Sequence, residues 1–277
     1  MSTAISIDAD GSRAVSVGPF AGLVHAHRHS RTRWWVEALA IVWLAWIYDG
    51  ITNLAPLRLH VALAHAQELL GIERVLHIAP ELSLDRWLAG QHGLGLAVSD
   101  YYDNAHFILT LGLLGWLWWR RADIYRPLRN ALVLVNLLGF VVFWLYPVAP
   151  PRMLGGFVDV VDSTHAFGSW HSGALASHAN ELAAMPSLHI AWAGWFAIAL
   201  WRASSRHWVR ALGVLHPVLT ALAVLATGNH FVLDIAGGLL VLWASVLLVR
   251  FGPGLSAGTL RAARTARHKV VTKSATG

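Results

Sequence analysis

The sequence of 277 residues contains no cysteine. Structural disulfides and chemistry at a thiolate are therefore excluded, because both need a cysteine sulfur. Charged side chains are scarce as well: Asp, Glu, Lys and Arg together make up 13% of the chain, whereas a soluble domain carries about a quarter. This composition argues against an ordinary soluble domain.

Apolar residues are abundant instead. They make up 56% of the chain, its mean hydropathy is +0.52, and it holds 15 Trp and 24 Gly. Trp gathers at membrane interfaces, and Gly is tolerated within membrane helices. We therefore expect an integral membrane protein that is embedded in the lipid bilayer. The net charge of +6 reflects membrane topology, as shown below, and no nucleic-acid partner is expected.

Apolar stretches predict about six transmembrane helices. They lie roughly at 34–48, 102–119, 128–146, 186–201, 208–227 and 230–249. Residues 51–97 mix apolar residues at helical spacing with charged ones, so we expect one or two interfacial helices there, or a re-entrant pair. The predicted fold class is all-α, a polytopic membrane helical bundle with interfacial helices.

The distribution of positive charge orients these spans. Six spans leave both termini on one side, and with that side inside, 17 of the 21 Lys and Arg residues are cytoplasmic. The four outer ones are Arg58, Arg74, Arg86 and Arg152. This split follows the positive-inside rule and predicts a multi-pass protein of the cell membrane. We divide it into a polar basic segment (1–33), one membrane-embedded catalytic domain (34–250) and a basic cytoplasmic tail (251–277), which we expect to be disordered.

A polar motif opens the fourth span, at residues 184–189. Pro186 can begin a helix, because it has no N–H to lose. The N–H groups of Ser187, Leu188 and His189 would then lack partners within the helix and attract an anion. A hydroxyl and an imidazole lie in the same turn. The competing interpretation is that Ser187 only caps a membrane helix while His189 lies at the interface.

The loop before the sixth span adds a histidine and a carboxylate. His230 and Asp234 are four residues apart, so in a helix the carboxylate can reach the ring and support its positive charge. Asp234 is the only acidic residue after Glu181, and a carboxylate inside an apolar span is a candidate functional residue. His230 alone would more often be an interfacial histidine.

The third polar loop follows the third span and carries Arg152 after a run of prolines. A guanidinium matches the oxygens of a phosphate in a bidentate manner, although an arginine at this depth can also reach up to lipid headgroups. By the predicted topology, all three loops lie on the extracytoplasmic side. The sequence therefore predicts a phosphate site on that face.

These residues resemble a known family, the type 2 phosphatidic acid phosphatase superfamily, and within it the inositol phosphorylceramide synthase-like branch. The resemblance covers roughly residues 74–250. It is carried by four motifs: Tyr102-x-x-x-His106-Phe107, Pro147-x-Ala149-Pro150-Pro151-Arg152, Pro186-Ser187-Leu188-His189 and His230-x-x-x-Asp234. Their order and their placement on one side make the resemblance more specific than any single motif.

The resemblance implies a role for each residue. His230 would attack phosphorus and form a phosphohistidine, and Asp234 would orient its ring. His189 would protonate the departing oxygen and then activate water or an acceptor alcohol. Arg152 and Ser187 would bind the phosphate oxygens. The substrate would be a membrane lipid phosphoester, with water or an alcohol as acceptor.

Two departures from the family pattern concern the positively charged residues that bind the phosphate. The Lys and Arg-Pro of the first motif are missing, since the nearest match, at residues 126–127, is on the inner side. The Ser-Arg of the third motif is replaced by Ala223 and Val224. Thr227 or Asn229 could compensate or contact the acceptor. Further candidates for acceptor binding on the outer side are Tyr102 and His106.

Other functional classes remain open at this point. An intramembrane serine hydrolase would use Ser187 as nucleophile and His230 as base, although Ser187 lacks a Gly-x-Ser-x-Gly elbow. Haem binding through histidine pairs is a non-hydrolytic alternative, and transport is another. We expect no metal and no cofactor, because one acid among scattered histidines is a poor divalent cage. The sequence leaves the oligomeric state open.

Overall fold

The computed structural model describes residues 5–7, 13–15, 33–54, 58–164 and 182–252. The chain divides into two compact units, Met1–Ser30 and Arg31–Gly277. In the first unit, β1 (Ile5–Ile7) pairs with β2 (Arg13–Val15) in an antiparallel ladder. Residues 253–277, which make up nearly all of the predicted basic tail, lie outside the described residues.

The second unit is helical. Its order is α1 (Trp34–Leu54), α2 (Leu59–Val75), α3 (Glu81–Ala89), α4 (His92–Arg120), α5 (Ala122–Leu145), the short 3₁₀ turn η3 (Pro151–Met153), α6 (Val160–Thr164), α7 (Leu188–Ala203), α8 (His207–Ala226) and a C-terminal helix, Val232–Gly252. The all-helical prediction is confirmed for this unit.

Three of these helices are long and apolar enough to cross a membrane: α5, α8 and the C-terminal helix. Within the described part of the chain, α7 has the predicted apolar character but only 16 residues. α4 is longer than the predicted span, because it begins at His92 with a polar first half. The six-span topology therefore stays a prediction.

The core of the bundle lies where α4, α5, α7 and the C-terminal helix meet. Trp195 of α7 is fully buried there, and its indole N–H donates to the Leu128 carbonyl of α5 at 2.8 Å. Small residues allow close packing: a Cβ on Gly194 would lie 2.6 Å from Leu242 of the C-terminal helix. The middle of α7 is thus packed closely against two neighbouring helices.

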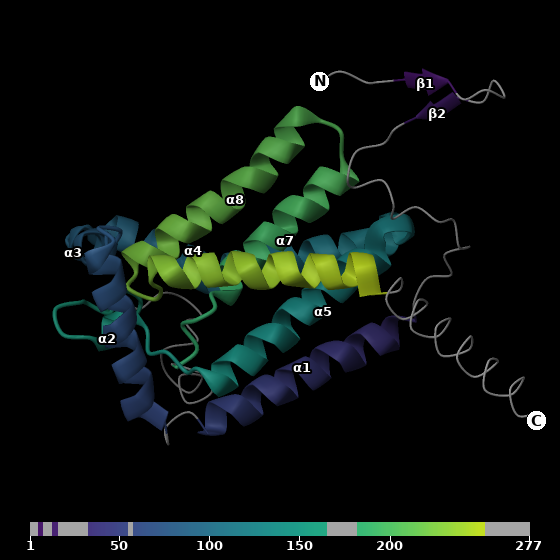
Figure 1. The fold of residues 1–277 in the computed structure, drawn as a ribbon. Helices are drawn as coiled ribbons and strands as arrows, with labels where there is room; N and C mark the ends of the chain where they lie inside the picture. Colours follow the sequence, from purple (N-terminus) through teal and green to yellow (C-terminus); the bar gives the residue numbers. More distant parts are fainter. Residues whose placement is uncertain (1–4, 8–12, 16–32, 55–57, 165–181, 253–277) are drawn as a thin grey trace, which may run out of the picture. The chain divides into compact units, whose positions relative to one another are not determined.

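One end of the bundle carries the candidate site. α2 and α3 lie at this end, and α2 crosses the direction of α1 and α5 (Figure 1). A second apolar cluster joins α2 to the segment after α5, to residues 182–185 and to Phe231. In this way a stretch predicted to lie along the interface covers the ends of α5 and α8 and the beginnings of α7 and the C-terminal helix.

Candidate active site

The start of α7 differs in detail from the sequence prediction. The helix begins at Leu188, two residues after Pro186, and Ser187 is its N-cap, whose Oγ accepts from the Ile190 N–H at 3.4 Å. The Ser187 N–H donates to the Asp234 carbonyl at 3.0 Å. The prediction that this N–H is available to an anion is therefore wrong. It joins α7 to the C-terminal helix instead.

His230 lies just before the C-terminal helix and is 4% exposed. Its Nδ1 is 2.8 Å from the Ala184 carbonyl and 3.3 Å from Asp234 Oδ2. A carbonyl only accepts hydrogen bonds, so Nδ1 must carry the hydrogen. In the neutral ring this leaves the lone pair on Nε2, the nitrogen that faces away from Ala184 and Asp234.

Asp234 reaches His230 by a different route from the one predicted. Because His230 precedes the helix, the two residues do not share a helical face; the carboxylate bends back over the first turn. Its Oδ2 accepts from the Phe231 N–H at 2.8 Å as well as approaching His230. Asp234 is fully buried, so its charge acts on the ring with little screening by water.

His189 faces the lone pair of His230. Its Nδ1 is 3.3 Å from His230 Nε2, and the two rings meet at an interplanar angle of 66°. The structure thus brings together the two histidines that the sequence predicted as nucleophile and acid, although they are 41 residues apart. Two basic nitrogens at this separation can hold one proton between them.

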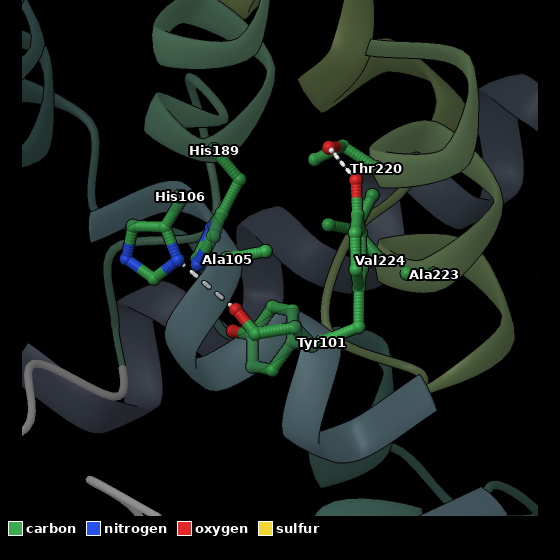
Figure 2. A pocket seen from close by; sticks show the side chains of 8 residues that line it. Tyr101, Ala105, His106, His189, Thr220, Ala223 and Val224 are labelled. Carbon is green, nitrogen blue, oxygen red and sulfur yellow. Dashed lines mark hydrogen bonds between the residues drawn. The ribbon is translucent and has the colours of Figure 1, made fainter. Parts of the chain in front are cut away.

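The other side of His189 is covered by α4. Tyr102 stacks on its ring, with centroids 4.6 Å apart, and His106 meets it edge-on at 4.4 Å. Figure 2 shows His106 and His189 side by side, with the hydrogen bond that links His106 Nδ1 to the Tyr102 carbonyl at 3.0 Å. The predicted acceptor-side residues therefore lie next to the predicted acid.

A small pocket opens along this aromatic group. Its lining residues are Tyr101, Tyr102, Ala105, His106, His189, Thr220, Ala223 and Val224. The space between them is too narrow for a water molecule. A ligand can therefore reach His189 from this side only if the aromatic rings move apart.

Arg152 lies in η3 and is buried, with 6% of its side chain exposed. Its Nε is 3.0 Å from Asp159 Oδ2, and its Nη1 donates to Asn229 Oδ1. Its backbone N–H donates to the Gly228 carbonyl at 2.8 Å. Arg152 is thus fixed to the loop before His230, and part of its charge is balanced by Asp159, which sequence reasoning missed.

Thr227 and Asn229 form a chain of hydrogen bonds that ends at Arg152. The Thr227 hydroxyl donates to the Ala223 carbonyl, and the Asn229 amide donates to that hydroxyl, each at 2.8 Å. Both residues are buried. Gly228 between them has φ +63°, and a Cβ there would lie 2.9 Å from Asp85 Oδ1, so this turn needs glycine. In this geometry, Thr227 and Asn229 position the guanidinium.

A backbone pairing connects the Arg152 loop to His230. Val148 bridges Ala183 in a parallel sense: the Val148 N–H donates to the Leu182 carbonyl at 3.2 Å, and the Ala184 N–H donates to the Val148 carbonyl at 3.1 Å. The Ala184 carbonyl is the one that holds His230. Two loops that are far apart in the sequence are therefore in fixed register beneath the site.

Three acidic residues near the site were also missed: Glu73, Glu81 and Asp85 are fully buried. Burial raises the pKa of Asp85, and the nearby charge of Asp159 adds to this, against the opposing hydrogen bond from the Val158 N–H. The sequence places these acids among interfacial charges. Their spacing is one signal that distinguishes them from solvated charges, because Glu81 and Asp85 are four residues apart and lie on the same face of α3.

The comparison with protein families decides the relationship. A model described as the PAP2 superfamily matches residues 67–248. The chain belongs to the PAP2 superfamily. No curated protein and no solved structure matches the chain. The matched region runs from α2 into the C-terminal helix and contains all the site residues described above. PAP2 superfamily members are phosphatases and phosphotransferases, and the family match together with the apolar helices fits a membrane phosphatase-like protein.

Proposed function

We propose that this PAP2 superfamily protein hydrolyses or transfers the phosphoryl group of a lipid phosphoester through a phosphohistidine on His230. The observation that carries the proposal is the orientation of that ring. Ala184 and Asp234 hold Nδ1, and the Nε2 lone pair is directed at His189, 3.3 Å away. A nucleophile needs this arrangement, a fixed tautomer with its reactive nitrogen facing an acid.

The reaction has two steps that mirror each other. In the first, His230 Nε2 attacks phosphorus, the bond from phosphorus to the leaving oxygen breaks, and His189 gives that oxygen a proton. In the second, His189 takes a proton from water or an alcohol, whose oxygen attacks phosphorus and releases His230. The Asp234 carboxylate stabilises the positive ring in between. A positioned acid–base group of this kind contributes about 10²–10⁴-fold.

Substrate entry requires the two rings to separate. A reacting atom needs about 3–3.5 Å to its attacking group, and the nitrogens are only 3.3 Å apart. His230 is the ring held in place, by the Ala184 carbonyl and Asp234, whereas His189 packs on Tyr102 and His106. We infer that His189 is the ring that moves, and that Tyr102 and His106 adjust with it and contact the acceptor.

Arg152 is the main phosphate ligand in this proposal; Ser187 has only its hydroxyl hydrogen to offer, because its N–H donates to Asp234 and its Oγ accepts from Ile190. The Arg152 Nε and one Nη1 hydrogen are engaged by Asp159 and Asn229, which leaves other N–H groups of the guanidinium for phosphate oxygens. The Asp159 side chain is 38% exposed, so it can turn towards water when phosphate arrives. Such electrostatic stabilisation is the main catalytic term in phosphoryl transfer.

We further propose that the site faces the extracytoplasmic side of the cell membrane, with both termini inside. The split of 17 to 4 positive residues supports this orientation, and the three helices suited to membrane spanning support the membrane location alone. The hydrolase alternative with Ser187 as nucleophile is disfavoured, because this side chain is fully buried and its Oγ caps α7.

Rapid quench of a radiolabelled lipid phosphoester tests the mechanism. His230→Ala should leave no labelled protein and no turnover. His189→Ala should be most impaired on poor leaving groups, because an alkoxide needs the proton, and should accumulate an acid-labile, base-stable phosphoprotein. His92→Ala is the matched control, since His92 is exposed at the start of α4, and it should behave as the wild type.

Two outcomes would contradict the assignment. Label trapped in His230→Ala but absent from His189→Ala would reverse the two histidines. Label on Ser187 would replace the mechanism with the serine alternative. A screen of lipid phosphates with and without added polyols, which compares free phosphate with new phospholipid, distinguishes hydrolysis from transfer.

A further inference from the structure

A buried carboxyl group from α2 contacts the catalytic turn from behind. Glu73 is fully buried, and its Oε1 accepts from the Leu233 N–H at 2.6 Å. Leu233 lies in the first turn of the C-terminal helix, next to Asp234. Glu73 therefore binds one of the N–H groups that a helix start leaves without an intrahelical partner, and it does so one residue from the carboxylate that orients His230.

A second buried carboxyl group approaches Glu73 from α3. The turn between α2 and α3 places His77 in the left-handed region, with φ 58°, and the Ile78 N–H donates back to the Glu73 carbonyl at 2.9 Å. This is the geometry of a Schellman C-cap. It reverses the chain so that Glu81 in the first turn of α3 comes within hydrogen-bonding reach of the Glu73 side chain.

A negative charge on Glu73 is unfavourable in this setting. Within the described residues, Glu73 Oε2 and both Glu81 oxygens have no N–H or hydroxyl donor, so a proton on one of the pair is the available donor. The charged groups that face Glu73 are Glu81 from α3 and Asp234 from the C-terminal helix, and both are acidic. Two unpaired negative charges side by side in a dry site are strongly unfavourable.

The pKa of Glu73 reflects this environment. The pKa of Glu73 is raised to about 9: burial is the largest cause, the hydrogen bond with Glu81 and the charges of Glu81 and Asp234 act in the same direction, and the bond from the Leu233 N–H opposes them. The pair therefore holds a proton at neutral pH.

We propose that Glu73 and Glu81 are positioning residues that share one proton and thereby hold the first turn of the C-terminal helix, so that Asp234 and His230 stay aligned. The role of the pair in turnover rests on the proposed function. Loss of the shared proton places a further negative charge, on Glu73, beside Glu81 and Asp234. The resulting repulsion pushes α2 and α3 away from this turn and moves Asp234 from His230 Nδ1.

Substitution of Glu73 by glutamine removes the titratable proton but keeps the size and the hydrogen-bonding pattern of the protonated side chain. In Glu73→Gln the amide oxygen can accept from Leu233 and the amide nitrogen can donate to Glu81, so the variant imitates the protonated pair at every pH. We expect wild-type turnover at neutral pH. Above pH 9 the ratio of variant to wild-type kcat should rise about tenfold per pH unit. Glu73→Ala should lose activity at all pH values, and Glu68→Gln, at an exposed position of α2, is the matched control.

A second measurement does not depend on turnover. Infrared spectroscopy of the purified full chain should show a protonated carboxyl at neutral pH that disappears in Glu73→Gln but not in Glu68→Gln. Absence of that band would overturn the shared proton. The band together with identical pH profiles for wild type and Glu73→Gln would overturn the positioning role. Absence of wild-type turnover on every phosphoester would refute the proposed function and leave the infrared test of the shared proton standing.

Discussion

Gly238 on the C-terminal helix offers a direct test of how the start of α7 positions the site. A Cβ added there would lie 2.3 Å from the Ser187 carbonyl oxygen and 3.3 Å from its carbonyl carbon. An ordinary carbon–oxygen contact is about 3.3 Å, so Gly238→Ala requires a displacement of about 1 Å. The atom that must move is backbone, and it accepts the Ala191 N–H within α7.

The displacement falls where it affects chemistry most. His189 is two residues after Ser187 and must stay opposite His230. A misplacement of about 1 Å costs on the order of 10²-fold in rate. Overpacking costs about 1–3 kcal/mol of stability, which the better helix propensity of Ala offsets by about 0.5–1 kcal/mol. We therefore expect a roughly 100-fold loss of kcat with only a modest fall in melting temperature.

The neighbouring glycine provides the matched control. A Cβ on Gly237 would lie 3.4 Å from Pro186 Cβ, an ordinary contact, so Gly237→Ala should keep wild-type kcat and equal or raise the melting temperature. Phosphate release from a lipid phosphate in detergent micelles and thermal unfolding followed by Trp fluorescence provide the two readouts. If Gly238→Ala stays within about twofold of wild-type kcat, the close fit of Ser187 against this helix does not control the site.

Two further predictions concern the charge and the membrane face of the site. Asp159 accepts from the Asp162 N–H at 3.0 Å at the start of α6, a bond that Asp159→Asn can keep while it frees Arg152 from the carboxylate. Inhibition by inorganic phosphate or vanadate should therefore strengthen roughly two- to fivefold, whereas Asp162→Asn at an exposed position nearby should change nothing; an unaltered inhibition constant for Asp159→Asn would show that Asp159 does not compete with phosphate. In this cysteine-free chain, Gln91→Cys should react with a membrane-impermeant thiol reagent in intact cells and Ser205→Cys only after lysis; the reverse pattern would invert the topology.

The sequence predicts the helical class well, because long apolar stretches leave few alternatives. It is weaker on boundaries. α4 begins at His92, ten residues before the predicted span, because its first half is too polar for a hydropathy signal yet packs against α6 and α8. The stretch 51–97 has the charge pattern of interfacial helices. Three of its acids are nevertheless buried against other parts of the fold, and such tertiary contacts leave no signal in the local sequence.

The candidate site divides in a similar way. The proximity of His189, His230 and Asp234 was expected from short motifs and their placement on one side. The Ala184 carbonyl that fixes the tautomer was not, because a backbone acceptor has no residue type that marks it. Asp159 was missed for another reason: an acid in a loop resembles a solvated charge until its partner is known.

The pairing of Val148 with Ala183 has a consequence for how such a site can diversify. Arg152 follows one side of this pairing, and the carbonyl that holds His230 follows the other. The proposed anion-binding residue and the carbonyl that fixes the proposed nucleophile are therefore carried by one backbone unit, while Tyr102 and His106 belong to α4. Under the proposed function, mutations along α4 can alter which acceptor fits without changing how Arg152 and His230 are held, so in the evolution of such enzymes we expect acceptor preference to drift while phosphoryl transfer to His230 is retained.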